Sequence, residues 1–184
     1  MAFAGNVDEL ALLQTVSLKK AVTAEVIAAH LGVGGVSAGG QAAYDALIEQ
    51  GKATENRGAI SLSDKGRSEL DDQLDAERVS IDEDSIAELF EQFGALDEEF
   101  GKLLADVEAD GFVDALVALD RKAQNVFDDV SAFVPRLSRY QDLFAEALGK
   151  VKGGALTWAT AGNIDSYATV WNEMRAELAG ASGN

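Results

Sequence analysis

The stretch SAGGQAAYDALIEQ, residues 37–50, decides how the first half of this chain is interpreted. Its large apolar residues Tyr44, Leu47 and Ile48 recur at helical spacing, and glycine follows at position 51, which predicts a helix that ends there. The polar residues of the stretch include two acids, Asp45 and Glu49, but no lysine or arginine. The sequence therefore predicts an amphipathic helix whose exposed side carries no positive charge.

Two further helices are predicted before this stretch, over residues 7–17 and 24–31, with Thr23 as the N-cap of the second. After it, the sequence ATENRGAISLS, residues 53–63, alternates apolar and polar residues around the turn signal Asn56-Arg57-Gly58 and predicts a β-hairpin. Ser63 can cap another helix. The order helix, helix, helix, hairpin, helix is typical of a winged helix-turn-helix domain, which we assign to residues 1–75.

In a DNA-binding winged helix, the third helix enters the major groove and contributes polar and cationic side chains to phosphates and bases. Here residues 1–75 hold 6 bases and 11 acids, so the domain should repel DNA. We therefore expect a protein partner and no DNA binding. The alternative is a winged-helix transcriptional regulator that binds DNA as a dimer, with the wing cations Lys52, Arg57 and Lys65 on phosphates.

Residues 76–184 have a different pattern and form the second predicted domain, an antiparallel helical bundle. Apolar residues follow two successive seams with alternating steps of three and four, as in packed helix pairs. The first seam is Ile86, Leu89, Phe93, Leu96, Phe100, Leu103 and Val107, and the second is Phe112, Leu116, Leu119, Ala123, Val126, Val130 and Phe133. Gly94 and Gly101 lie inside the first helix, which we expect to be broken or closely packed at those points.

Pro135 suits the first turn of the next helix, and Asp165 or Ser166 suits the cap of a last one. The last helix carries Tyr167, Val170, Trp171, Met174 and Leu178, and we expect Trp171 to lie in the core. The alternative is an exposed aromatic anchor for a partner, so Tyr167 and Trp171, with the cations Arg136 and Arg139, are the candidate partner-binding residues. The wider basic cluster, which also includes Lys150 and Lys152, is expected to pair with the acidic segment 76–129, and a phosphate site is its alternative.

The composition of this 184-residue chain limits which kinds of catalytic or metal site it can form. Its net charge is −17, and residues 76–129 alone hold 16 acids and 4 bases. There is no cysteine, and the single histidine, His30, lies on a plain amphipathic helix, where we expect a late-helix cation. The acids match neither a calcium loop nor a carboxylate–histidine bundle site. We expect no catalytic residue, no cofactor and no metal, and, without a signal sequence or membrane span, a cytoplasmic protein.

The C-terminal sequences PRLSRYQDLFAEALGKVKGGALTW and IDSYATVWNEMRAEL resemble a winged-helix-plus-helical region of actinobacterial proteins associated with phosphoenolpyruvate-utilising enzymes, the relatives of pyruvate phosphate dikinase. The resemblance extends to LLQTVSLKKAVTAEVIAAHLG in the first half, and its most specific part is residues 165–173. The family is expected to have histidines where this chain has Ala168 and Arg175. The resemblance therefore implies a non-catalytic accessory or regulatory subunit that binds a protein, such as a phosphotransferase subunit. The oligomeric state stays open, with a homodimer as one alternative.

Overall fold

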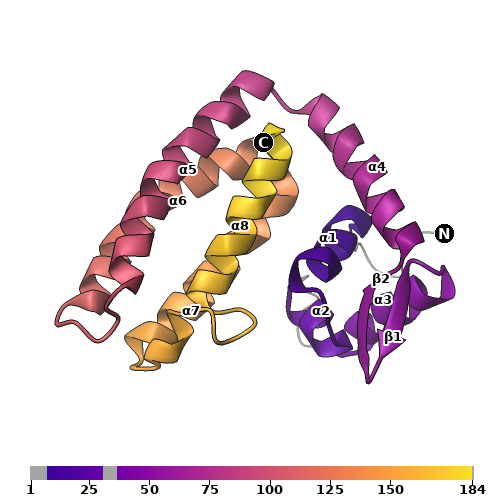
Figure 1. Ribbon diagram of the computed structural model, residues 1–184, viewed down its shortest axis with the longest axis horizontal. Coiled ribbons are helices and arrows are strands. Elements are labelled where there is room, and N and C mark those ends of the chain that lie inside the picture. The colour runs from indigo at the N-terminus through magenta and orange to yellow at the C-terminus, as the bar shows by residue number, and fades with distance from the viewer. Residues whose placement is uncertain (1–7, 31–36, 184) are drawn as a thin grey trace. The chain divides into compact units, whose positions relative to one another are not determined.

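The computed structural model describes residues 8–30 and 37–183, which form eight α-helices and one two-stranded sheet (Figure 1). This confirms a mainly helical fold. The chain divides into two compact units, Met1–Val79 and Ser80–Asn184, and each contains its own cluster of buried apolar side chains. The domain boundary expected after residue 75 falls inside a helix that continues to Ser80. None of the described helices is both long and apolar enough to cross a lipid bilayer.

The first unit follows the order of elements that the sequence predicts. Its elements are α1 (Glu9–Lys19), α2 (Ala24–His30), α3 (Ser37–Glu49), β1 (Ala53–Asn56), β2 (Ala59–Leu62) and α4 (Asp64–Ser80). The predicted caps are present, because the Ser63 hydroxyl accepts a hydrogen bond from the Gly66 N–H at 3.1 Å and Thr23 accepts one from the Val26 N–H at 3.4 Å. The core is built around Leu12, Leu13, Ile27, Leu47 and Ile60.

The hairpin turns where the sequence places its tip. Arg57 and Gly58 have φ angles of 54° and 80°, and two left-handed residues are what a tight two-residue hairpin turn requires. The antiparallel register pairs Glu55 with Ile60 and Asn56 with Ala59. On its other edge β2 forms a short bridge, since Ile60 and Val22 exchange N–H···O=C bonds of 2.8 and 3.0 Å. The hairpin is thereby tied to the segment between α1 and α2.

Helices α2 and α3 approach closely at a glycine. A Cβ atom at Gly40 would lie 2.2 Å from the Ala24 carbonyl oxygen and 2.6 Å from the Ala28 Cβ, so a larger residue there would push the helices apart. The glycine-rich sequence before it predicts a turn between the helices, but residues 31–36 lie outside the described residues.

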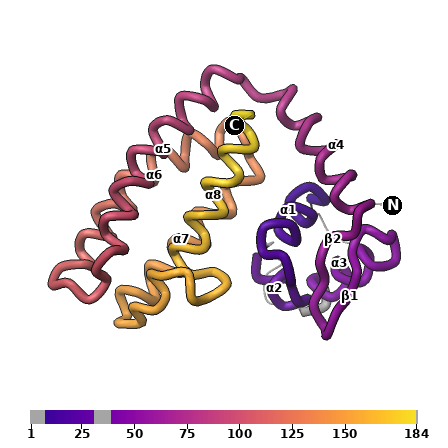
Figure 2. Tube along the Cα trace, in the orientation of Figure 1, coloured from indigo at the N-terminus to yellow at the C-terminus, as the bar shows by residue number. Residues whose placement is uncertain are grey.

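The second unit contains α5 (Glu83–Leu104), α6 (Phe112–Phe133), α7 (Arg139–Lys152) and α8 (Tyr167–Ser182), with short 3-10 turns at Pro135–Ser138 and Leu156–Trp158. Pro135 begins the first of these turns, as predicted. Helices α5 and α6 lie side by side and run in opposite directions (Figures 1 and 2). Both seams are largely buried, although Phe133, at the end of α6, is 40% exposed.

The two glycines inside α5 do not have the effect that the sequence analysis expects. The helix is continuous through Gly94 and Gly101, and a Cβ atom at either position would meet nothing within 4 Å. Both glycines lie on the exposed side of α5, away from the buried seam. The expectation of a break or a close approach is therefore wrong at both positions.

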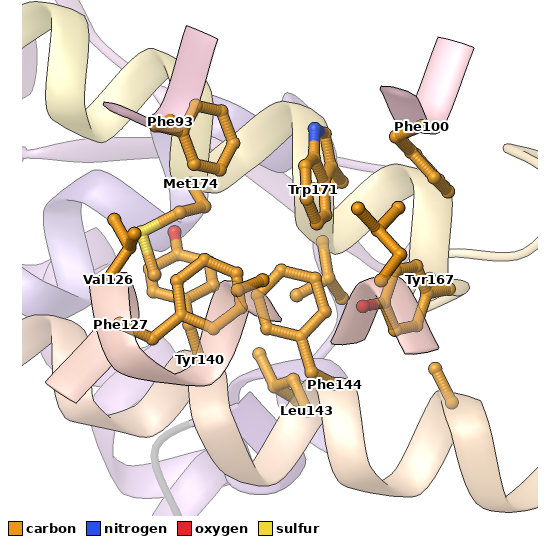
Figure 3. Packing of buried hydrophobic residues seen from close by; sticks show 14 of the residues in the cluster. Phe93, Phe100, Val126, Phe127, Tyr140, Leu143, Phe144, Tyr167, Trp171 and Met174 are labelled. Atoms are coloured by element: carbon orange, nitrogen blue, oxygen red, sulfur yellow. The ribbon is translucent and has the colours of Figure 1, made fainter. Parts of the chain in front are cut away.

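An aromatic cluster fills the centre of the second unit (Figure 3). Trp171 and Tyr167 have no exposed area, which confirms that Trp171 is a core residue. Their polar atoms are satisfied by acids of other helices: the Trp171 indole N–H donates to Asp97 at 2.8 Å, and the Tyr167 hydroxyl donates to Asp120 at 2.9 Å. Part of the acidic excess of residues 76–129 therefore holds α8 in place.

Candidate functional site

A cleft with a volume of about 360 Å³ lies in the first unit, between the start of α2, helix α3 and the hairpin. Three carboxylates line it, one from each of these elements, and none of its lining residues is a lysine or arginine. The lining residues are Thr23, Ala24, Glu25, Gln41, Tyr44, Asp45, Glu55 and Gly58. This cleft is thus acidic.

Local structure explains how the cleft residues come together. On α3, Gln41, Tyr44 and Asp45 are three and four residues apart and share a face, and the Gln41 amide donates to the Asp45 carboxylate at 2.8 Å. On β1, Glu55 pairs with Ile60, and directly paired strand residues project to the same side of a sheet. Glu55 therefore shares a side with the buried Ile60 and reaches the cleft near the end of the hairpin.

The start of α2 contributes the third carboxylate of the cleft, after those of α3 and β1. Glu25, in the first turn of α2, accepts a hydrogen bond from the Thr23 hydroxyl at 3.3 Å. Within the described residues, no lysine or arginine forms an ion pair with Glu25, Asp45 or Glu55. The cleft therefore keeps three negative charges that the first unit itself does not neutralise.

Tyr44 also lines the cleft. The residue packs in the core of the first unit and is 6% exposed, and its hydroxyl is not among the fully buried polar atoms that lack a hydrogen-bond partner. Burial raises the pKa of this hydroxyl, and the nearby carboxylates of Glu55 and then Asp45 raise it further. Tyr44 therefore remains neutral at physiological pH and can either donate or accept a hydrogen bond.

The three predicted wing cations have different environments. Lys52 is buried, its side chain 10% exposed, and it pairs with Glu9 and, at 3.8 Å, with Glu69. This corrects its assignment as a phosphate contact, since its ammonium is engaged inside the first unit. Lys65 is exposed and donates to the Gln50 carbonyl at 2.8 Å, while Arg57 is exposed at the hairpin tip.

The four candidate partner-binding residues are interior groups of the second unit. Tyr167 and Trp171 have no exposed area, and the side chains of Arg136 and Arg139 are 5% and 13% exposed. Side chains with so little exposed area offer little contact to a partner that docks on this conformation. We therefore no longer assign these four residues to a partner-binding surface.

The two arginines pair with a carboxylate that the sequence analysis does not single out. Glu177 of α8 is fully buried and lies 2.6 Å from the Arg136 guanidinium and 3.5 Å from that of Arg139. The Tyr140 hydroxyl also donates to Glu177 at 3.2 Å, and burial, followed by the charge of Glu177, raises the pKa of Tyr140. These partners are in α8 and not in the acidic segment 76–129, which corrects the expected pairing.

The rest of the basic cluster does not assemble into a phosphate site. The Lys150 ammonium pairs with Glu146 at 2.7 Å and lies 3.5 Å from the centre of the Trp158 ring. Lys152 is exposed at the end of α7. Arg136 and Arg139 are engaged with Glu177, so these cations serve separate contacts and do not converge on one ligand.

The residues considered for catalysis or metal binding also do not form a site. His30 lies in the last turn of α2, the late-helix position that the sequence predicts, and its side chain is buried, 2% exposed. Of the two positions where the resembled family is expected to have histidine, Ala168 is buried and Arg175 pairs with Asp97 at 3.3 Å. Among the described residues, no group of three histidine, cysteine, aspartate or glutamate side chains lies close enough to hold a metal ion.

Sequence reasoning identified Asp45 as a polar residue of α3 but missed the cleft. Glu55 could have been found, because the predicted hairpin tip and the inward position of Ile60 together place it on the same side. Glu25 could not have been found from the sequence, because its position depends on the packing of α2 against α3. No protein-family model matches the chain, and comparison with curated proteins and with solved structures gives no significant match.

Proposed function

We propose that this chain is a non-catalytic accessory or regulatory subunit that binds a protein partner through α3 and the hairpin. The order of elements in the first unit and the bridge between Val22 and Ile60 support a winged-helix domain. The packed helices α5–α8 support a helical bundle as the domain that follows it in the sequence. We propose the first unit as the binding module because it contains the acidic cleft.

The observation that carries this proposal is the charge of the face formed by α3 and the hairpin. In DNA-binding winged helices this face meets phosphates, and affinity comes largely from lysine and arginine that replace counterions. Here the same face presents Glu25, Asp45 and Glu55 around a cleft, while Lys52 is buried. Such a surface repels a polyanion and attracts a cationic protein surface.

The second candidate is a transcriptional regulator that binds DNA as a dimer. Exposed Arg57 at the hairpin tip and exposed Lys65 favour it, because both could contact phosphates. We rank it second since three carboxylates line the cleft beside α3 and the hairpin, and they would repel DNA phosphates. Binding of duplex DNA at nanomolar affinity and physiological salt would reverse this order.

The resemblance to proteins associated with phosphoenolpyruvate-utilising enzymes supports a phosphotransferase subunit as the partner. The burial of His30, the single histidine of the chain, supports a non-catalytic role, because a phosphoryl donor has no access to its ring in this conformation. Purified chain incubated with labelled phosphoenolpyruvate is therefore expected to stay unlabelled. Acid-labile label on His30 would overturn the non-catalytic part of the proposal.

Site-specific photo-crosslinking tests the binding face. A benzophenone amino acid replaces exposed Gln41, beside the cleft, and in a matched control it replaces exposed Ser68 on α4. In cells that express the chain, position 41 is expected to give a protein adduct that position 68 does not. That protein is then purified and its affinity for the unmodified chain is measured. A DNA adduct at position 41, adducts with a second copy of this chain alone, or equal adducts at both positions would each reject the proposal.

A further inference from the structure

We propose that Asp110 is a site of spontaneous covalent modification, at which the main chain rearranges through a cyclic imide to isoaspartate. Asp110-Gly111 is the one Asp-Gly pair of the sequence, which has no Asn-Gly pair. The pair lies in the segment that joins α5 to α6 (Figure 1). This segment belongs to the second unit, so the site is independent of the proposed binding face.

The rearrangement needs no reagent other than water. The Gly111 nitrogen gives its proton to water and attacks Cγ of the protonated Asp110 carboxyl group. An N–Cγ bond forms, the Cγ–O bond breaks and one water molecule leaves, which closes a five-membered succinimide ring. Water then adds to either ring carbonyl. Addition at Cγ restores aspartate, whereas addition at the main-chain carbonyl breaks the original peptide bond and leaves isoaspartate.

The attacking nitrogen of Gly111 is accessible in the structure. Residues 109–112 form a tight turn, which the Phe112 N–H closes by donating to the Ala109 carbonyl at 3.1 Å. Gly111 is the third residue of this turn and has φ and ψ angles of 83° and 5°, as a type II turn requires. It is exposed, has no side chain beside its nitrogen, and its N–H bonds to no other described residue. No hydrogen bond within the described chain therefore has to break before the nitrogen attacks.

The Asp110 carboxyl group is also free to move toward this nitrogen. Asp110 is exposed and forms no hydrogen bond or ion pair with another described residue. Asp82 shows the opposite case, because its carboxylate caps α5 by accepting from the Ser85 N–H at 2.9 Å. A carboxyl group with such a bond is held away from its own main chain, and the Asp110 carboxyl group has no such restraint.

Two Asp-Ser pairs provide comparisons within the same chain, because serine adds only a small side chain next to the attacking nitrogen. In Asp84-Ser85 the serine N–H is the one that donates to the Asp82 carboxylate. In Asp165-Ser166 the serine has no exposed area and its N–H donates to the Asn163 carbonyl at 3.2 Å. Both nitrogens would have to give up a hydrogen bond before attack. The structure therefore favours reaction at Asp110 over either pair.

Isoaspartate at position 110 would alter the connection between α5 and α6. The main chain would then run through Cβ and Cγ of the residue, which lengthens the turn by one methylene group. Phe112, 4% exposed, begins α6 and its buried seam directly after this turn. The Ala115 N–H donates to the Gly111 carbonyl at 2.9 Å, and we expect this first helical bond to weaken.

Peptide mapping of the aged full chain tests the site. Purified chain is held at physiological temperature in mildly acidic buffer and digested, and each peptide is offered to an isoaspartyl carboxyl methyltransferase with labelled S-adenosylmethionine. We expect the Asp110 peptide to carry most of the label. A synthetic peptide of residues 106–115 should convert within a few-fold of the rate in the folded chain, because the fold does not protect the site. Label at Asp84 or Asp165 equal to that at Asp110, or a rate far below that of the peptide, would overturn the inference.

Matched variants locate the reacting carboxyl group. Asp110→Glu requires a six-membered ring, which closes much more slowly, so this variant should lose most of the label. Asp84→Glu, the same change at an exposed acid of α5, should keep the wild-type amount. Retention of the label in Asp110→Glu would overturn the inference. In aged wild type, hydrogen exchange of the Ala115 N–H should become several-fold faster, and an unchanged rate in chains that carry isoaspartate would refute the expected loosening of α6.

Discussion

Replacement of Trp171 by alanine should destabilise the second unit by about 3–5 kcal/mol, the range found for buried aromatic residues. The indole has no exposed area, and its ring lies 4.6 Å from that of Phe100 and 4.9 Å from that of Phe93, measured between ring centres. Phe127, Phe144 and Tyr167 surround it at 6.0–6.1 Å. Truncation would remove all these contacts and leave a cavity that the surrounding helices fill only in part.

The lost hydrogen bond should contribute little to this value. Asp97, which accepts from the indole, is 30% exposed and also pairs with Arg175, so water and the arginine can satisfy it in the variant. Trp171→Phe keeps a ring in the same space and should cost about 1–2 kcal/mol. The difference between the two variants then measures the packing of the cluster.

Urea unfolding followed by the fluorescence of Trp158 measures this effect in the correct unit. The chain has two tryptophans and both lie in the second unit, so the signal of the alanine variant comes from Trp158 alone. Trp158→Ala, which alters a half-buried ring, is the matched control; its unfolding is followed by the fluorescence of Trp171, and it should cost less than about 1 kcal/mol. A loss below about 1 kcal/mol for Trp171→Ala would refute the assignment of this residue as the centre of the core.

Glu177→Ala should destabilise the second unit by about 3–5 kcal/mol, because it leaves the buried cations Arg136 and Arg139 without their carboxylate, and unfolding curves unchanged from wild type would contradict this. Gly94→Ala and Gly101→Ala should each stabilise α5 by up to about 1 kcal/mol, because the added methyl group has no other atom within 4 Å. A lower thermal unfolding temperature than wild type in either variant would contradict these exposed positions. Burial, and then the charge of Asp120, raises the pKa of Tyr167 above the ordinary value near 10. The neutral hydroxyl therefore contributes its full stabilisation below pH 10, and above pH 10 the free energy of unfolding falls by about 1.4 kcal/mol per pH unit. Stability of the wild type should therefore fall more steeply above pH 10 than that of Tyr167→Phe, and parallel curves would show that Tyr167 is not the titrating group.

Most elements of the fold could be predicted because their signals are local. The hairpin tip follows from Gly58, which adopts positive φ without strain, and the start of the 3-10 turn follows from Pro135. The buried seams of α5 and α6 follow from steps of three and four along the sequence. Each of these features depends on residues within one or two turns of the chain.

The features that could not be predicted depend on packing between distant elements. Glu177 reads as an ordinary acid on a helix, and only the fold brings it to Arg136, 41 positions earlier. Lys52 comes directly after the end of a predicted helix, so the sequence predicts an exposed side chain. The packing of α1 and α4 instead brings Glu9 and Glu69 to its ammonium. The cleft was missed for the same reason, since its three acids come from α2, α3 and β1.

The position of α8 at the end of the second unit has a consequence for synthesis. The indole of Trp171 is 74 residues after Asp97, so at about 5–20 residues per second a ribosome needs roughly 4 to 15 seconds to make one after the other. During that interval the aromatic rings of α5–α7 and two cations that will later be buried have no partner from α8. The nascent second unit is thus a candidate client of chaperones that hold exposed apolar surface, whereas the first unit, made earlier and from contacts within its own residues, can fold while the rest is still being translated.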